Sequence, residues 1–188
     1  RGAPRAARAA AHPCAEQDGY VWVHATPDAE PAVPPFRFPH LGAPGYSAVR
    51  RELTVRAPLA AAIENVLDVP HTAFLHGGLF RTPGRGAEID VVVRRFADRC
   101  EAEYLGEPRP EGILGRLLAP RGGVVSHVDR FLLPSVAQVE YRIGEGSHLV
   151  ATTALTPVDA ATTRLFSVAT FRLPVPGWLV RPPVAPIA

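Results

Sequence analysis

The stretch from Gln138 to Leu155 reads Gln-Val-Glu-Tyr-Arg-Ile-Gly-Glu-Gly-Ser-His-Leu-Val-Ala-Thr-Thr-Ala-Leu and decides the fold class. Residues 138–143 alternate polar and apolar side chains, the period-two pattern of a strand with one buried face. The segment Gly144-Glu145-Gly146-Ser147 then predicts a hairpin turn, which leads into a second strand over residues 149–155. We therefore expect antiparallel strand pairing at this point of the chain.

The same alternation occurs on both sides of this hairpin. It predicts strands around residues 89–94, 101–104 and 163–173, and a half-buried strand over residues 49–55, in which Arg51 is the misfit. Strands in series with short turns give an antiparallel sheet, which needs a helix or a second layer to cover one face. The fold class predicted is therefore α+β.

A helix is expected directly after the strand at residues 49–55. Pro58 suits the first turn of a helix, because its missing N–H would have no helical partner there in any case. Good helix formers follow from Ala60 to Leu67. This helix delivers the polar residues that bear most directly on function.

Those polar residues lie in the segment Asn65-Val66-Leu67-Asp68-Val69-Pro70-His71-Thr72-Ala73-Phe74-Leu75-His76. Neutral imidazoles are good ligands for iron, zinc, copper or nickel. His71 and His76 are five residues apart, about 140° round a regular helix, so they would not share one helical face. Both reach one ion only if the backbone breaks or loosens between them, and Pro70 disfavours a helical residue before it.

The pattern Asn-x-x-Asp-x-x-His-x-x-x-x-His resembles the iron-ligand motif of the Rieske non-haem iron oxygenase alpha subunits, of the aromatic-ring-hydroxylating type. The resemblance implies His71 and His76 as ligands of a mononuclear Fe(II). It implies Asp68 as the carboxylate that bridges electron transfer from a neighbouring subunit's cluster, and Asn65 as a residue near the iron. It also implies that the sheet is curved and packed with helices, as in a helix-grip, START-like catalytic domain.

A second resemblance lies near the start of the chain. Asp18-Gly19 is a turn signal before an apolar run over Tyr20–Val23, and the phrase Glu-x-Asp-Gly-x-Val-Trp-Val is similar to the closing strand of the Rieske domain in the same family. Residues 1–25 are thus expected to be the C-terminal remnant of that domain. Residues 26–45, rich in proline, are expected to form an extended linker, and residues 46–188 an incomplete catalytic domain.

The resemblance implies an oxidoreductase, a mono- or dioxygenase. Such an enzyme takes reducing equivalents from NAD(P)H through a ferredoxin or reductase partner and a 2Fe–2S cluster. It uses O2 at Fe(II) for hydroxylation, dihydroxylation or oxidative demethylation of an apolar or aromatic substrate. Because the electron crosses a subunit boundary in the family, the parent is expected to be a homotrimer or a larger assembly, and cytoplasmic.

Two sets of ligands are expected to lie outside this chain. The Cys-x-His…Cys-x-x-His pattern that a Rieske cluster needs does not occur here, and we expect it upstream of Arg1. The third iron ligand, a carboxylate, is expected beyond Ala188, since neither Asp129 nor Asp159 matches the family's position. The fragment alone is therefore expected to be inactive.

Two other functions fit part of the sequence. A metal-free START-like module that binds hydrophobic ligands would use the same fold. A zinc hydrolase built on His71 and His76 is weaker, because no third ligand lies nearby and Asp68 is a less suitable base than a glutamate on a regular helix. Iron stoichiometry and upstream cysteines would separate the oxygenase from the binding module.

Composition excludes other classes of protein. A content of 47% apolar and 20% charged residues is that of a globular chain. The net charge of +2 gives no argument for a nucleic-acid partner, and the sequence holds no uncharged apolar run of about 18 residues that would span a membrane.

The remaining histidines and cysteines carry weaker expectations. We expect His24, His40 and His148 at the surface, whereas His127, in a probable strand, faces either the pocket or solvent. Cys14 is read as a small apolar residue that leads into a strand and Cys100 as part of a strand, and neither is expected to bind a metal. The helical spacing of the apolar residues within 113–118 predicts either a short lid helix or a surface connection.

Overall fold

The computed structural model describes residues 9–68, 89–108, 123–144 and 146–174 of the 188-residue chain. The chain forms two compact units, residues 1–38 and residues 39–188. The boundary falls inside the proline-rich segment of residues 26–45. The expectations for His71, His76 and residues 113–118 lie outside the described residues.

The first unit contains a two-stranded antiparallel hairpin of β1 (Cys14–Gln17) and β2 (Tyr20–Val23). Asp18 and Gly19 connect the strands with φ angles of 59° and 81°, the pair of positive values that matches the right-handed twist of a tight hairpin. The Asp18 carboxylate also accepts a hydrogen bond from the backbone N–H of Phe38 at 2.8 Å. The turn and the strand predicted over Tyr20–Val23 are therefore confirmed.

The second unit is built on a seven-stranded antiparallel sheet with the strand order β3-β9-β8-β7-β6-β5-β4. Its strands are β3 (Ser47–Val55), β4 (Asp90–Arg95), β5 (Arg99–Leu105), β6 (Val125–Leu132), β7 (Val136–Ile143), β8 (Ser147–Asp159) and β9 (Thr162–Arg172). Ile143 pairs with Ser147 across the hairpin between β7 and β8. The antiparallel sheet and the turn at residues 144–147 are thus confirmed.

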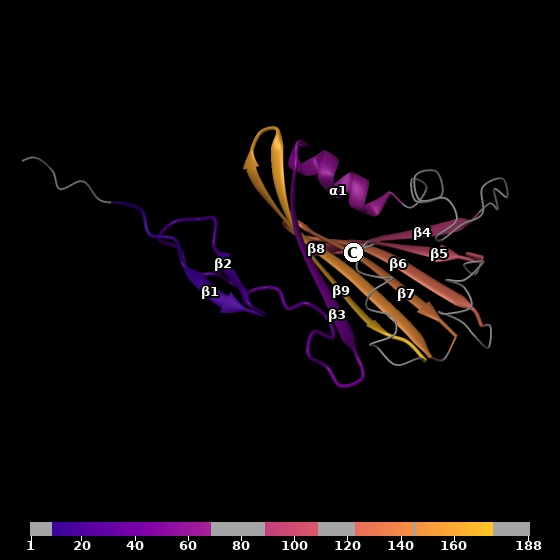
Figure 1. Ribbon diagram of the computed structural model, residues 1–188. Coiled ribbons are helices and arrows are strands. Elements are labelled where there is room, and N and C mark those ends of the chain that lie inside the picture. The colour runs from indigo at the N-terminus through magenta and orange to yellow at the C-terminus, as the bar shows by residue number, and fades with distance from the viewer. Residues whose placement is uncertain (1–8, 69–88, 109–122, 145, 175–188) are drawn as a thin grey trace, which may run out of the picture. The chain divides into compact units, whose positions relative to one another are not determined.

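The helix α1 (Leu59–Leu67) follows β3 and packs against β6, β7, β8 and β9. Figure 1 shows α1 lying across one face of the sheet. Pro58 occupies the N-cap position, and its carbonyl accepts a hydrogen bond from the N–H of Ala62 at 3.1 Å. The helix predicted from Pro58 to Leu67 therefore forms, with the proline one residue before its first turn.

The core lies between α1 and the sheet. Ala62 packs there with Ala137, Leu155 and Leu165, which come from three neighbouring strands. Side chains alternate between the two faces of a strand, so these residues lie on one face of the sheet. We call this face, which α1 covers in part, the helix-side face, and we call the opposite one the outer face. α1 thus covers part of one side of the sheet.

The two edge strands differ from the expected half-burial. β3 was expected to bury one face, but residues 50–54 are exposed, including Leu53 at 42%. All six residues of β4 are exposed as well. β3 and β4 each have a single neighbour in the sheet, so the described residues cover them less than the central strands. An alternating sequence pattern does not reveal that a strand lies at an edge.

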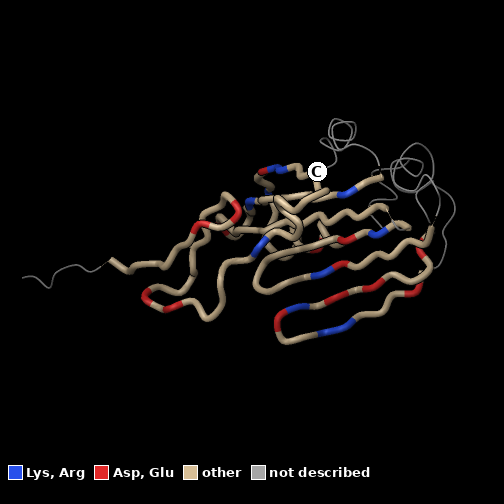
Figure 2. Tube along the Cα trace, turned by 90° about the horizontal axis from the view of Figure 1, so that it is seen from below, with Lys and Arg blue, Asp and Glu red and all other residues tan. Residues whose placement is uncertain are grey.

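Charged residues of both signs lie along several strands of the sheet, as Figure 2 shows. The stretch of β8 from Ser147 to Leu155 carries no Arg, Lys, Asp or Glu, and most of it is buried. Within the described residues, no helix is long and apolar enough to cross a membrane.

Candidate functional site

The end of α1 presents Asn65 and Asp68 to solvent. Ile63, Val66 and Leu67 pack against the core, whereas Asn65 and Asp68 are exposed. Residues three apart are neighbours on a helix surface, so the amide and the carboxylate project on the same side of this last turn. The predicted pair of polar residues is therefore brought together beside the predicted ligand segment.

The backbone leaves the helix before the predicted iron ligands. α1 ends at Leu67, and Asp68 has φ −80° and ψ 88°, outside the helical region. A continued helix would have placed His71 and His76 on different faces. Two imidazoles with a carboxylate are donors that suit Fe(II), so the residue types of the predicted iron segment fit that ion. The described residues hold no group of three or more potential metal ligands.

A second cluster of polar residues lies on the helix-side face of the sheet, around His127, for which the sequence left pocket and solvent open. Tyr104, His127 and Tyr141 occupy adjacent positions on β5, β6 and β7. The imidazole of His127 stacks between the two phenol rings, with centroids 4.3 Å from Tyr104 and 4.0 Å from Tyr141. The two rings cover both faces of the imidazole.

Both ring nitrogens of His127 contact carboxylates. Nδ1 lies 2.5 Å from Oε2 of Glu107, and Nε2 lies 2.8 Å from Oδ1 of Asp129. A neutral imidazole has one N–H, so one of these contacts would set a nitrogen lone pair against a carboxylate oxygen. Both contacts are favourable only when His127 is the doubly protonated imidazolium.

Burial and charge oppose each other at this histidine. His127 has 0% exposure, and the side chains of Glu107 and Asp129 are 6% and 4% exposed. Burial alone would lower the pKa of His127, but the hydrogen bonds with Asp129 and Glu107 outweigh it and raise that pKa. The contacts of both ring nitrogens with carboxylates therefore favour the cationic form of His127.

Asp129 retains one unused acceptor. Its Oδ2 atom is buried and has no hydrogen-bond partner among the described residues. We call Glu107, His127 and Asp129, with Tyr104 and Tyr141, the His127 cluster. A sequence signal for it existed, because His127 and Asp129 share one strand face with the apolar Val125 and Phe131, so a polar pair interrupts an apolar row.

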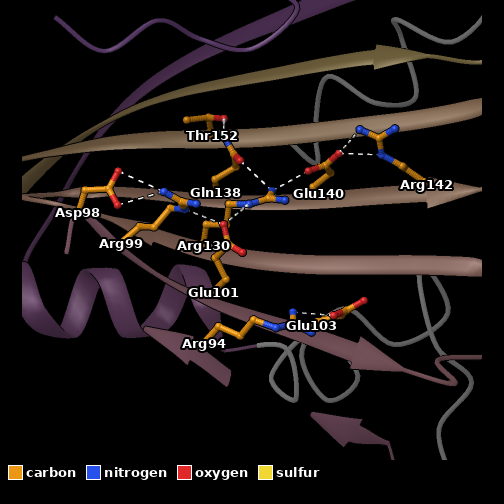
Figure 3. Close-up of polar contacts among 10 residues, drawn as sticks. All are labelled: Arg94, Asp98, Arg99, Glu101, Glu103, Arg130, Gln138, Glu140, Arg142 and Thr152. Carbon is orange, nitrogen blue, oxygen red and sulfur yellow. Dashed lines mark hydrogen bonds and ion pairs between the residues drawn. The ribbon is translucent and has the colours of Figure 1, made fainter. Parts of the chain in front are cut away.

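The outer face of the sheet carries a separate ionic network (Figure 3). Arg130 extends between Glu101, at 3.3 Å, and Glu140, at 2.6 Å. Glu140 also accepts hydrogen bonds from Arg142 at 2.9 Å and from Nε2 of His148 at 2.8 Å. Partial burial would raise the pKa of Glu140, but these donors outweigh it and lower the pKa to about 2.

The surface position expected for His148 is wrong, because this residue is 4% exposed. Its Nδ1 lies 2.6 Å from the hydroxyl of Tyr46, whose ring stacks on His40 at 4.3 Å. Burial lowers the pKa of His148, against the opposing effect of Glu140. His148 thus links the segment before β3 to the outer-face network and lies away from the helix-side face.

Other expectations have simpler outcomes. His40 is exposed, as expected, and His24 is half-buried. Cys14 and Cys100 lie in strands β1 and β5 as free thiols.

Comparison with known proteins gives a family match. The family model described as "Vanillate O-demethylase oxygenase C-terminal domain" matches residues 55–175. That range includes α1, the predicted iron segment and the His127 cluster. Among curated proteins, none matches the sequence significantly.

Solved structures share the fold. NdmA of Pseudomonas putida CBB5 with caffeine superposes with a TM-score of 0.70 at 21% identity, covering 100% of this chain and 55% of that one. Dicamba monooxygenase bound to dicamba has a TM-score of 0.70 at 18% identity, covering 85% and 49%. NdmB of Pseudomonas putida CBB5 has a TM-score of 0.66 at 19% identity, covering 89% and 46%. The chain spans about half the length of these structures.

Proposed function

The chain belongs to the family of vanillate O-demethylase oxygenase C-terminal domains, the catalytic domains of Rieske non-haem iron oxygenases, and on that premise we propose that it is the catalytic portion of an O2-dependent oxygenase. The reaction class is hydroxylation, dihydroxylation or oxidative demethylation of an apolar or aromatic substrate. The observation that carries this proposal is the end of α1 at Leu67. There the backbone leaves the helix directly before the two histidines, inside the range that the family model matches.

Each residue of the motif has a role in this proposal. His71 and His76 would hold a mononuclear Fe(II), which, when bound, supplies the redox chemistry that activates dioxygen. Asp68 lies three residues before the first histidine, so its carboxylate orients that imidazole and couples the iron to a neighbouring subunit's cluster. Asn65 lies on the same side of the last turn as Asp68 and contributes a neutral hydrogen-bonding group there.

The parent protein needs partners and cofactors that this chain does not contain. We infer a 2Fe–2S cluster upstream and electrons from NAD(P)H through a ferredoxin or reductase. We infer a homotrimer, in which the cluster of one subunit serves the iron of the next, and a cytoplasmic location beside the source of NAD(P)H. The similar structures hold caffeine and dicamba, both of which are aromatic rings, and this supports an aromatic substrate.

The test separates iron binding from turnover in the full-length protein. Asp68→Asn keeps the size of the side chain but removes its charge, so we expect iron content to stay at the wild-type level. Substrate-dependent O2 consumption should fall by about 10- to 100-fold or more, the usual effect of losing a group that orients a metal ligand. Asp159→Asn, at an exposed turn far along the sequence, is the matched control and should leave both unchanged.

Two outcomes contradict the proposal. Loss of iron in Asp68→Asn would assign this carboxylate to the metal and not to electron transfer. A wild-type protein that binds apolar rings but takes up neither iron nor O2 would be a START-like binding module.

A further inference from the structure

We propose that Oδ2 of Asp129 is the recognition point for a hydrogen-bond donor on the substrate ring, so the enzyme selects rings that carry an O–H or N–H group. This inference rests on the proposed function, because it names the substrate class for the same domain. Its evidence is the His127 cluster, which neither the family match nor the iron motif includes as a functional group.

The His127 cluster lies on the same side of the sheet as α1. His127 and Asp129 lie on β6, and Ala137 pairs with Phe131 of that strand on the same face. Ala137 packs with α1, so the cluster and the helix that leads to His71 occupy one side of the sheet. A ring bound over this face would lie on the same side of the sheet as α1, which ends at Leu67.

Asp129 has one carboxylate oxygen that is buried without a hydrogen bond among the described residues. A carboxylate oxygen that is buried without a hydrogen bond loses its hydration without compensation, and the loss is larger when the group is charged. Oδ1 of Asp129 is held by His127, but Oδ2 has no such partner among the described residues. His127 divides its single positive charge between Asp129 and Glu107, so it neutralises Asp129 only in part. The oxygen therefore favours a donor or a cationic N–H.

The contacts around His127 exclude some chemical classes of ligand. Tyr104 and Tyr141 cover the two faces of the imidazole, and both of its nitrogens are engaged by carboxylates. The imidazolium therefore has no lone pair with which to bind a metal and no free N–H with which to bind an anion. Among the buried side-chain atoms of the described residues, Oδ2 of Asp129 is the acceptor without a hydrogen-bond partner, and as part of a carboxylate it would repel an anionic group placed beside it.

The experiment uses iron-free full-length protein and three rings of similar size: phenol, anisole and acetophenone. Phenol carries a donor, whereas anisole and acetophenone carry only acceptors. We expect calorimetry or ligand-observed NMR to give a Kd for phenol about tenfold lower than for anisole, the discrimination of one charge-assisted hydrogen bond. This comparison needs no variant and so does not depend on how well a variant folds.

Asp129→Asn supplies the second comparison. An asparagine keeps an oxygen for His127 and places an NH2 group where Oδ2 was, so the preference should reverse in favour of acetophenone over phenol. Asp98→Asn, at the exposed turn between β4 and β5, is the matched control and should keep the preference for phenol.

Three outcomes would overturn the proposal: equal binding of phenol and anisole to the wild type, unchanged preference in Asp129→Asn, or no binding of any of the three rings. Because the measurement omits iron and O2, its result is independent of turnover. A phenol preference without oxygenase activity would leave this inference standing and remove the proposed function.

Discussion

At the scale of single residues, the central sheet strands bury polar groups on both faces, and each face does so differently. On the helix-side face, His127 stacks between two tyrosine rings, and two carboxylates that contact its nitrogens favour its cationic form. On the outer face, Glu140 is only partly buried and is held by the guanidinium groups of Arg130 and Arg142 and by an N–H of His148. The two groups therefore give opposite dependences of stability on pH.

The charge on His127 stabilises the fold at the lower end of the pH range. Its folded pKa is raised, so its contribution is complete below the unfolded value of about 6.5 and is lost as pH rises through the folded value. The carboxylates Glu107 and Asp129 and the phenols Tyr104 and Tyr141 face it. We expect wild-type urea-unfolding free energies to fall from about pH 7 upward in a step that is absent in His127→Gln.

The control for that step is His12→Gln, which changes an exposed histidine in the first unit. It should retain the loss of stability above neutral pH. If His127→Gln showed the same pH dependence as the wild type, the doubly protonated state of His127 would be incorrect.

The carboxylate of Glu140 stabilises the fold at the acid end. Its pKa is lowered to about 2, so its contribution is present above the unfolded value of about 4.5 and is lost as pH falls through about 2. We expect Glu140→Gln to cost about 1–3 kcal/mol at neutral pH, after allowance for partial solvent screening, and to flatten the acid limb of the stability curve. Chemical denaturation at several pH values measures both.

A matched change at Glu52 provides the comparison. Glu52 pairs with Arg164 in an exposed ion pair, with side chains 49% and 52% exposed. Glu52→Gln should therefore change stability by less than about 0.5 kcal/mol at any pH. Equal effects of the two substitutions would contradict the distinction between a partly buried network and a surface pair.

At the scale of elements, α1 and the centre of the sheet form the core. Leu155 on β8 is 2% exposed and packs with Ala62 and Leu165. We expect Leu155→Ala to lower the free energy of unfolding by about 2–5 kcal/mol, because it removes buried methyl groups and leaves a cavity. Val158 lies near the end of the same strand and is 61% exposed, so Val158→Ala should lower the free energy of unfolding by less than about 0.5 kcal/mol.

Urea unfolding of Leu155→Ala and Val158→Ala measures the two losses of stability. A similar, small loss for both would mean that α1 does not pack on β8 as described. The comparison is well controlled because both changes shorten an aliphatic side chain in one strand.

The strands, the hairpin turn and the helix could be predicted because they depend on local patterns. The alternation in residues 138–143, the Asp18-Gly19 turn and the run from Pro58 to Leu67 each specify an element without reference to the rest of the chain. Edge position and the burial of polar residues depend on neighbours far away in sequence. The exposure of residues 50–54 and the burial of His148 both depend on such distant neighbours, so the local pattern did not predict them.

The candidate site divides in the same way. Asn65 and Asp68 could be named because they share one local sequence motif with His71 and His76, at the end of a helix that the sequence predicts. For the His127 cluster the sequence signals only the polar pair of His127 and Asp129, since the stacking needs Tyr104, His127 and Tyr141 on three strands in register. A histidine in an alternating strand gives no sign of which partners the sheet will bring to it.

At the scale of the whole molecule, the family match unites these elements. The matched residues 55–175 include the helix, the predicted iron segment and the residues of the His127 cluster. The first unit, with its β1–β2 hairpin, remains predicted to be the end of a Rieske domain. The proposed enzyme therefore requires the full-length protein, with its own cluster and partners.

The most direct test of this account is the iron content of full-length protein with His71→Ala or His76→Ala, measured beside the visible absorbance of the 2Fe–2S cluster. We predict that each substitution removes the mononuclear iron and leaves the cluster spectrum unchanged, whereas His12→Ala changes neither. Wild-type levels of mononuclear iron in both histidine variants would contradict the assignment of the metal centre, and with it the oxygenase function.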